Sequence, residues 1–218
     1  MSFSLIKLFS KKSAIKAAVP EASSTLILQD VEADESVENS EPIPATTIYS
    51  LYVVPYVGIF KSSKTLDGIK QLIDYLDMLG DVPSIRQTKF FRETNNSSWG
   101  ILSRTTLSDH SRHVTDNLLN LFQSTFGKNI LPFRPMLTVL GLGHDIGKIR
   151  FFSSDEYVTA NHPIVSAQVV RHCFDGFDIP WLDKVENAIL NHHRSSGGEL
   201  DLLLKKADSL ARDAEILL

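Results

Sequence analysis

Cysteine is nearly absent from this chain of 218 residues, which has Cys173 alone. An intramolecular disulfide and a cysteine-based zinc site are therefore excluded, and we expect a reducing compartment, most simply the cytoplasm. Long apolar runs are also missing, because the longest candidate, residues 48–60, contains Pro55 and falls short of the roughly 20 residues that span a bilayer. The formal net charge is -4 and no basic stripe crosses residues 107–218, so nucleic acid is a disfavoured partner.

The first 47 residues are predicted to lie outside the folded core. Residues 20–47 are acidic and rich in Ser, Pro and Ala, a composition that cannot bury enough apolar surface to offset the entropy of ordering. We interpret them as a disordered linker. Residues 1–18 carry four lysines and no acid between apolar side chains. A frayed terminus is the simpler interpretation; the alternative is a short amphipathic helix that contacts a membrane surface or a protein and makes the chain peripheral to the membrane.

The remainder of the chain has helical patterning. Residues 48–102 form a small helical or mixed accessory segment, in which Ile69, Leu72, Ile73 and Leu76 recur at helical spacing before Gly80. Residues 103–218 contain five further predicted helices. We expect Ser108 or Asp109 to cap the first of these and Asn161 the third. No segment alternates as a strand would, so we predict an all-α bundle.

Histidine is distributed unevenly: the first 109 residues have none, and all seven lie between positions 110 and 193. Packing explains a single buried histidine more readily than it explains a set of His and Asp residues spread over five consecutive helices. In LGLGHDIGK, His144 and Asp145 close an apolar helix between glycines that permit close approach, and together they offer the mixed N and O ligands that divalent ions bind. Lys148 follows one turn later, with a charge suited to a phosphate group.

Residues 107–213 resemble the HD superfamily of metal-dependent phosphohydrolases. HSRHV is similar to the family's first-helix motif, in which the ligand is His110 and not His113. HDIGK is the family signature, and ADSLARD resembles the closing helix, which places the last aspartate at Asp208. The resemblance implies an HD-domain helical bundle in which one divalent ion is held by four residues: His110, His144, Asp145 and Asp208.

Two further segments, NHPIVSAQVV and ILNHHR, resemble elements of the branch that binds two metals, which includes the HD-GYP cyclic-dinucleotide phosphodiesterases. This resemblance implies a second ion on His162 and either His192 or His193, with Asp145 bridging, and ions drawn from Mn, Fe, Co, Ni, Zn or Mg. The GYP turn is absent, since Arg194 and SSGGEL follow the double histidine. Arg194 could contact a substrate phosphate, although a solvated arginine in an interhelical turn is the simpler interpretation.

The function implied is metal-activated attack of water on a phosphoester of a small substrate, a nucleotide or cyclic (di)nucleotide, with Asp145 and Lys148 as the catalytic residues. A non-catalytic HD-fold signalling or interaction module is one alternative, but such modules lose ligands and here all four core positions are filled. An HD-type relaxase or nuclease of a conjugative element is another, disfavoured by the missing basic stripe.

We expect His172, late in its helix, to be a helix C-terminal cation and not a metal ligand.

Overall fold

The computed structural model describes residues 47–85, 98–152, 161–195 and 197–217; the predicted linker and amphipathic start, up to residue 46, lie outside these ranges. Within them the regular structure is helical, which confirms the predicted all-α class, and β pairing is limited to an isolated bridge between Pro83 and Thr106. The elements, in chain order, are α2 (Ile48–Tyr52), the 3-10 turn η1 (Val54–Tyr56), α3 (Val57–Ser62), α4 (Leu66–Leu79), α5 (Ser98–Leu102), α6 (Leu107–Phe126), η3 (Gly127–Phe133), α7 (Arg134–Gly143), η4 (Ile146–Lys148), η5 (Arg150–Phe152), α8 (His162–Cys173), α9 (Leu182–Asn191) and α10 (Glu199–Ile216).

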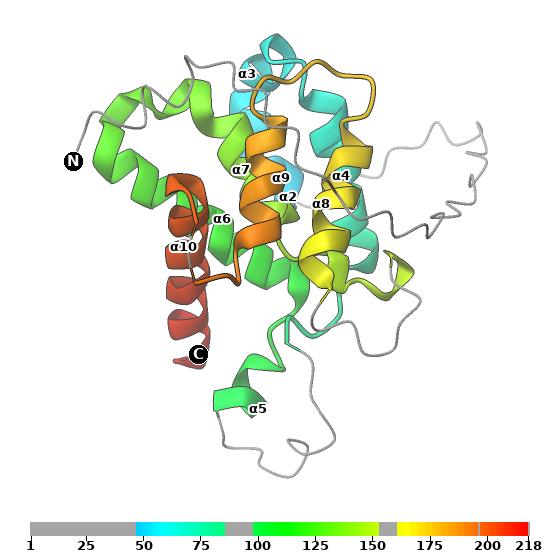
Figure 1. Ribbon diagram of the computed structural model, residues 1–218, viewed down its shortest axis with the longest axis vertical. Coiled ribbons are helices and arrows are strands. Elements are labelled where there is room, and N and C mark those ends of the chain that lie inside the picture. Colours follow the sequence, from blue (N-terminus) through cyan, green and yellow to red (C-terminus); the bar gives the residue numbers. More distant parts are fainter. Residues whose placement is uncertain (1–46, 86–97, 153–160, 196, 218) are drawn as a thin grey trace. The chain divides into compact units, whose positions relative to one another are not determined.

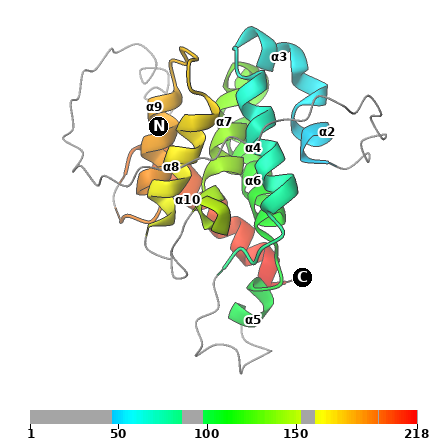
Figure 2. The same cartoon turned by 90° about the vertical axis from the view of Figure 1, so that its right-hand side faces the viewer.

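The short helix α7 forms the centre of the bundle. Every residue from Pro135 to Gly143 is buried, as expected for a helix that is apolar on all sides. It contacts α4, α6, α8 and α9, and it runs between α6 and α9 in Figure 1 and between α8 and α4 in Figure 2. A methyl group on Gly141 would lie 2.4 Å from Oγ1 of Thr115, so this glycine permits the close approach of α6. The carboxyl end of α7 is therefore enclosed by four helices.

The accessory segment packs on this centre through α4. Its predicted apolar face, Ile69, Leu72, Ile73 and Leu76, is buried, and the helix ends at Gly80 as the sequence indicates. α4 contacts both α7 and α8. After α4 the chain returns toward the start of α6.

Helix α6 begins at Leu107, before both predicted caps, and the assignment of Ser108 or Asp109 as its N-cap is wrong. Thr106 is the cap, because its backbone is extended and its hydroxyl accepts the N–H of Asp109 at 3.0 Å. The hydroxyl of Ser108 instead donates to the carbonyl of Leu76 in α4, at 2.7 Å. Asn161 does occupy the N-cap position of α8, but its side chain makes no capping hydrogen bond. Among the helices that the structure describes, none is long and apolar enough to cross a membrane.

Candidate metal centre

The carboxylate of Asp145 lies where the ends of several helices meet, and it is 2% exposed. Its Oδ1 is 3.1 Å from Nε2 of His162 and 3.5 Å from Nε2 of His192. Its Oδ2 is 3.4 Å from Nε2 of His144 and 3.7 Å from Nε2 of His110. These side chains come from α6, α8 and the ends of α7 and α9. One carboxylate thus faces two sets of imidazoles, one set on each oxygen.

The ligand atoms fall into two groups, in each of which all atoms lie within 4.8 Å of one another. The first histidine group consists of His110, His144 and Asp145, and the second histidine group consists of Asp145, His162, His192 and His193. The sequence left His192 and His193 as alternatives, and the structure brings both to the second group. His193 enters it through Nε2, which lies 2.9 Å from Nε2 of His162.

Asp208, from α10, lies at the border of the first histidine group. Its Oδ1 is 3.2 Å from Nε2 of His110, but the residue is not among the mutually close ligands of that group. Burial alone would raise the pKa of Asp208, but the neighbouring imidazoles of His110 and His144 together outweigh burial and lower the pKa well below its usual range. The carboxylate is therefore ionised beside the imidazole.

The chemistry of these residues suits the binding of a cation. In the part of the chain that the structure describes, buried atoms facing this centre make no hydrogen bond of acceptable geometry: Nε2 of His110, His144 and His192, Oδ1 of Asp145, and Oδ1 of Asp208. An unpaired buried polar atom costs about 1–3 kcal/mol, so a group of them needs a shared partner. Imidazole nitrogens and carboxylate oxygens together are a ligand set for borderline divalent ions.

Two of the imidazoles are oriented by backbone carbonyls. His144 and His192 are the C-cap residues of α7 and α9, and their Nδ1 atoms lie 2.8 Å from the carbonyl of Gly141 and 2.6 Å from that of Ile189. A carbonyl only accepts, so Nδ1 carries the proton in each ring and Nε2 presents its lone pair to the centre. The helix ends thus fix both the direction and the tautomer that a metal ligand requires.

The imidazole of His193, a member of the second histidine group, is uncharged at neutral pH. Burial and the neighbouring His192 and His162 lower the pKa of His193 to about 4. At neutral pH the ring is uncharged, which is the form that binds metal ions.

The comparison with known families agrees with this geometry. The family model of the HD domain matches residues 107–213, a range that contains every residue of both histidine groups. The chain belongs to the HD superfamily. HD domains are generally metal-dependent phosphohydrolases, and the histidine and aspartate groups are compatible with metal binding. No curated protein and no solved structure gives a significant match.

Lys148 lies beside the HD pair of this HD domain, where its ammonium pairs with the carboxylate of Asp145. Its ammonium is 2.5 Å from Oδ2 of Asp145 and 2.9 Å from the carbonyl of Ser84. Burial alone would raise the pKa of Asp145, but the Lys148 ammonium and the neighbouring imidazoles outweigh it and hold that pKa well below its usual range. The carboxylate of Asp145 is therefore ionised.

Sequence reasoning missed Arg212 and Ser84. One terminal nitrogen of Arg212 donates to Oγ of Ser84 at 2.7 Å, another lies 3.8 Å from Oδ2 of Asp145, and its Nε is 3.8 Å from Oδ1 of Asp208. The backbone carbonyl of Ser84 accepts from both Lys148 and Arg212. A buried serine of the accessory segment thus holds two cations beside the HD pair.

Glu215 was also missed. It is 1% exposed, and its Oε1 lies 2.8 Å from Nδ1 of His110 and 3.0 Å from Nδ1 of His113. His113 therefore contacts the centre through Glu215, in agreement with its exclusion as a ligand. Asp208, Arg212 and Glu215 are spaced by four and three residues, which places them on one face of α10. That spacing is the signal by which the sequence could have revealed the last two.

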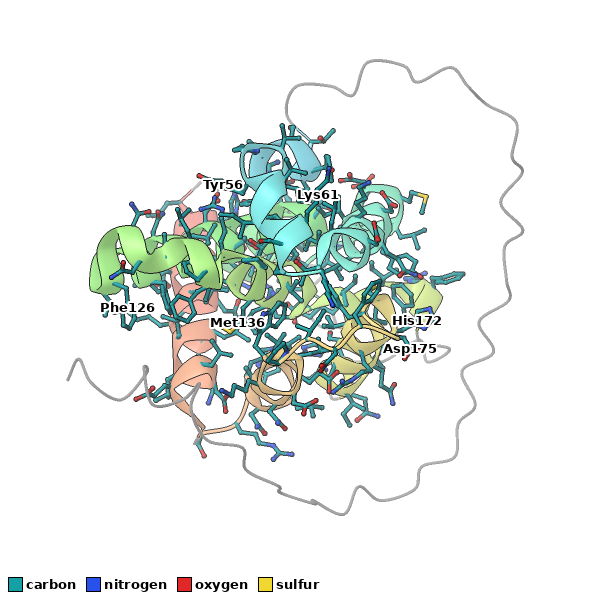
Figure 3. All side chains as sticks on the ribbon, turned by 90° about the horizontal axis from the view of Figure 1, so that it is seen from above. Tyr56, Lys61, Phe126, Met136, His172 and Asp175 are labelled. Carbon is teal, nitrogen blue, oxygen red and sulfur yellow. The ribbon has the colours of Figure 1, made fainter. Side chains whose placement is uncertain are left out.

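Two residues singled out in the sequence lie at the surface. Arg194, directly after His193, is exposed, and its backbone carbonyl accepts a hydrogen bond from Lys205. His172 is exposed in the last turn of α8, late in its helix as predicted; Figure 3 shows it at the periphery, near Asp175. Neither contributes an atom to the two histidine groups.

Proposed function

We propose that this HD domain hydrolyses a phosphoester of a nucleotide or cyclic dinucleotide, using two divalent ions held on either side of Asp145. The observation that carries the proposal is the buried carboxylate with a histidine group at each oxygen and unpaired ligand atoms in both groups. The first histidine group, with Asp208, would hold one ion, and the second histidine group the other. Mn, Fe, Co, Ni, Zn and Mg are the candidates.

Divalent ions bound there would lower the pKa of a water molecule and polarise the oxygens of the phosphoryl group. In the reaction, the water oxygen forms a bond to phosphorus, the bond between phosphorus and the leaving-group oxygen breaks, and that oxygen takes up a proton. The chain's contribution beyond its ligands is positive charge. Lys148 and Arg212 have side chains that are 15% and 18% exposed, so they border the centre and can offset the charge that grows on the phosphoryl oxygens.

An exposed aromatic side chain that follows Lys148 in the chain supports a nucleotide as the substrate. Phe151 lies three residues after Lys148, in η5, and is 60% exposed. An exposed ring can stack on a base whose phosphate is bound at the centre. Arg194, exposed after His193, is a weaker candidate for a contact with a second phosphate.

The activity test uses metal-free protein reloaded with each candidate ion. Hydrolysis is followed by chromatography on a panel of nucleotides, cyclic dinucleotides and aryl phosphates. We expect one class to be turned over and Asp145→Asn to abolish turnover. Asp183→Asn is the matched control, because it makes the same change of charge at an exposed position of α9, where the carboxylate pairs with Arg171.

Elemental analysis tests the metal content separately. We expect about two ions per chain and a loss of binding in Asp145→Ala. One ion per chain would restrict the proposal to the first or the second histidine group. Folded protein that binds no ion and hydrolyses none of the panel would contradict the proposal and favour a non-catalytic signalling module.

A further inference from the structure

Glu215 is a buried carboxylate whose oxygens are all engaged. Oε1 lies within hydrogen-bond distance of the Nδ1 atoms of His110 and His113, and Oε2 lies 3.2 Å from a terminal nitrogen of Arg212. Burial of a carboxylate is costly unless it is paired and hydrogen-bonded, and these three donors provide the pairing. The position of the carboxylate is therefore fixed between α6 and α10.

The hydrogen bond between Glu215 and His110 determines how the His110 ring faces the centre. A carboxylate accepts a hydrogen bond, so Nδ1 of His110 carries the proton and its Nε2 is left with a lone pair. That Nε2 makes no hydrogen bond, and the nearest oxygens are those of Asp208 at 3.2 Å and Asp145 at 3.7 Å. A lone pair and two carboxylates turned toward one another form a site that fits a cation. Glu215 thus holds the ring in the orientation that a cation needs.

The acceptor of the Nδ1 hydrogen bond differs between His110 and two other imidazoles of the centre. His144 and His192 donate to neutral backbone carbonyls, whereas His110 donates to a charged carboxylate. A charged acceptor makes a stronger hydrogen bond and makes the imidazole a more basic ligand.

We propose that Glu215 is a positioning residue for the metal centre: it orients His110 and raises the affinity of the first histidine group, not that of the second, for its ion. The inference rests on the proposed metal-binding function. If Glu215 instead served only to pack α10 on α6, its replacement would lower the stability of the protein without distinguishing between the two groups.

The test separates the two groups by substitution. His162→Gln leaves the first histidine group intact, and His144→Gln leaves the second. Metal-free full-length protein is titrated with Co²⁺ against a chelating competitor, with and without Glu215→Gln. We expect Glu215→Gln to weaken Co²⁺ binding about 10–100-fold in the His162→Gln background. We expect no change in the His144→Gln background.

Glu186→Gln is the matched control, because it removes a carboxylate that pairs with Arg171 away from the centre. It should change affinity in neither background. Circular dichroism of the metal-free proteins establishes that each variant is folded. If Glu215→Gln does not fold, Glu215→Asp replaces it: the charge stays, the carboxylate is withdrawn by one methylene, and the same selective loss is expected.

The possible results separate this inference from the proposed function. Equal affinity with and without Glu215→Gln, or an equal loss in both backgrounds, would overturn the role of Glu215 and leave the metal centre standing. A wild-type protein that binds neither Co²⁺ nor any of the other candidate ions would overturn both.

Discussion

The ammonium of Lys148 lies 2.5 Å from Oδ2 of Asp145, the same carboxylate oxygen that faces His110 and His144. The protein therefore places a cation of its own on the oxygen that a metal ion of the first histidine group would use. This arrangement stabilises the buried charge when no ion is bound, and it makes Lys148 and a metal ion competitors for one ligand.

The competition predicts opposite effects of Lys148→Met on binding and on catalysis. Metal affinity should stay equal or become tighter, because the competing ammonium is gone, whereas kcat should fall by ~10²-fold, because charge that stabilises the phosphoryl oxygens is lost. Both are measured on the same preparation, by chelator competition and by steady-state kinetics. Lys61→Met, at an exposed position of α3, is the control. A fall in metal affinity with unchanged kcat would contradict the assignment.

Ion binding should also raise thermal stability. An ion at 100 times its dissociation constant stabilises the folded state by about 2.7 kcal/mol. For a chain of this size, that gain raises Tm by about 5–10 °C. Thermal unfolding of metal-free protein with and without each divalent ion measures the shift, which Asp145→Asn should abolish. If no ion moves Tm, the unpaired ligand atoms of the centre have another partner.

Gly147 is predicted to be essential for bringing η4 against α8. A methyl group there would lie 2.5 Å from the carbonyl oxygen of His162 and 2.6 Å from the backbone nitrogen of Ser166. Gly147→Ala should therefore destabilise the fold by about 1–3 kcal/mol in urea unfolding and weaken metal binding by moving Asp145 from His162. Gly58→Ala is the matched control, since nothing lies within 4 Å of the new methyl group and the residue is inside α3. It should be neutral or slightly stabilising.

The burial of Cys173 predicts a loss of protein stability at alkaline pH. Burial raises the pKa of its thiol to about 12, whereas an unfolded chain releases the proton near pH ~8.5. Ionisation therefore favours the unfolded state. The contribution of the thiol to stability is fully present below about pH 8.5 and is lost as pH rises toward 12.

The measurement for Cys173 is the free energy of unfolding between pH 8 and pH 10, compared with that of Cys173→Ala, which should lack this part of the decline. The folded thiol should also resist alkylation and react fully in denaturant. Rapid alkylation of the native protein would show that α8 opens at this position.

The parts of the site that sequence predicted are those with local patterns. His144 and Asp145 follow an apolar helix and lie between glycines, and the face of α4 can be read from the spacing of its apolar residues. The candidate ligands could be named because each sits in a short motif. The cap of α6 could not, since Ser108 had a competing partner in α4 that no local pattern reveals.

The parts that sequence did not predict depend on packing between distant segments. Ser84 reaches the centre because α4 returns the chain to the start of α6, and a lone serine carries no signal of that path. Glu215 meets His110 across 105 positions of sequence. Its spacing from Asp208 gives it the right face of α10, but an acidic residue near a helix end has many ordinary explanations. Only the crossing of α6 and α10 gives it a partner.

The position of Glu215 has a practical consequence for work on this domain. The family match ends at Asp213, two residues before it. A shortened chain designed to that boundary would retain His110, His144, Asp145 and Asp208, and it would contain the whole family match. It would nevertheless lack the acceptor that holds the ring of His110, and weak metal binding by such a fragment would reflect where it was cut and not the chemistry of the intact protein.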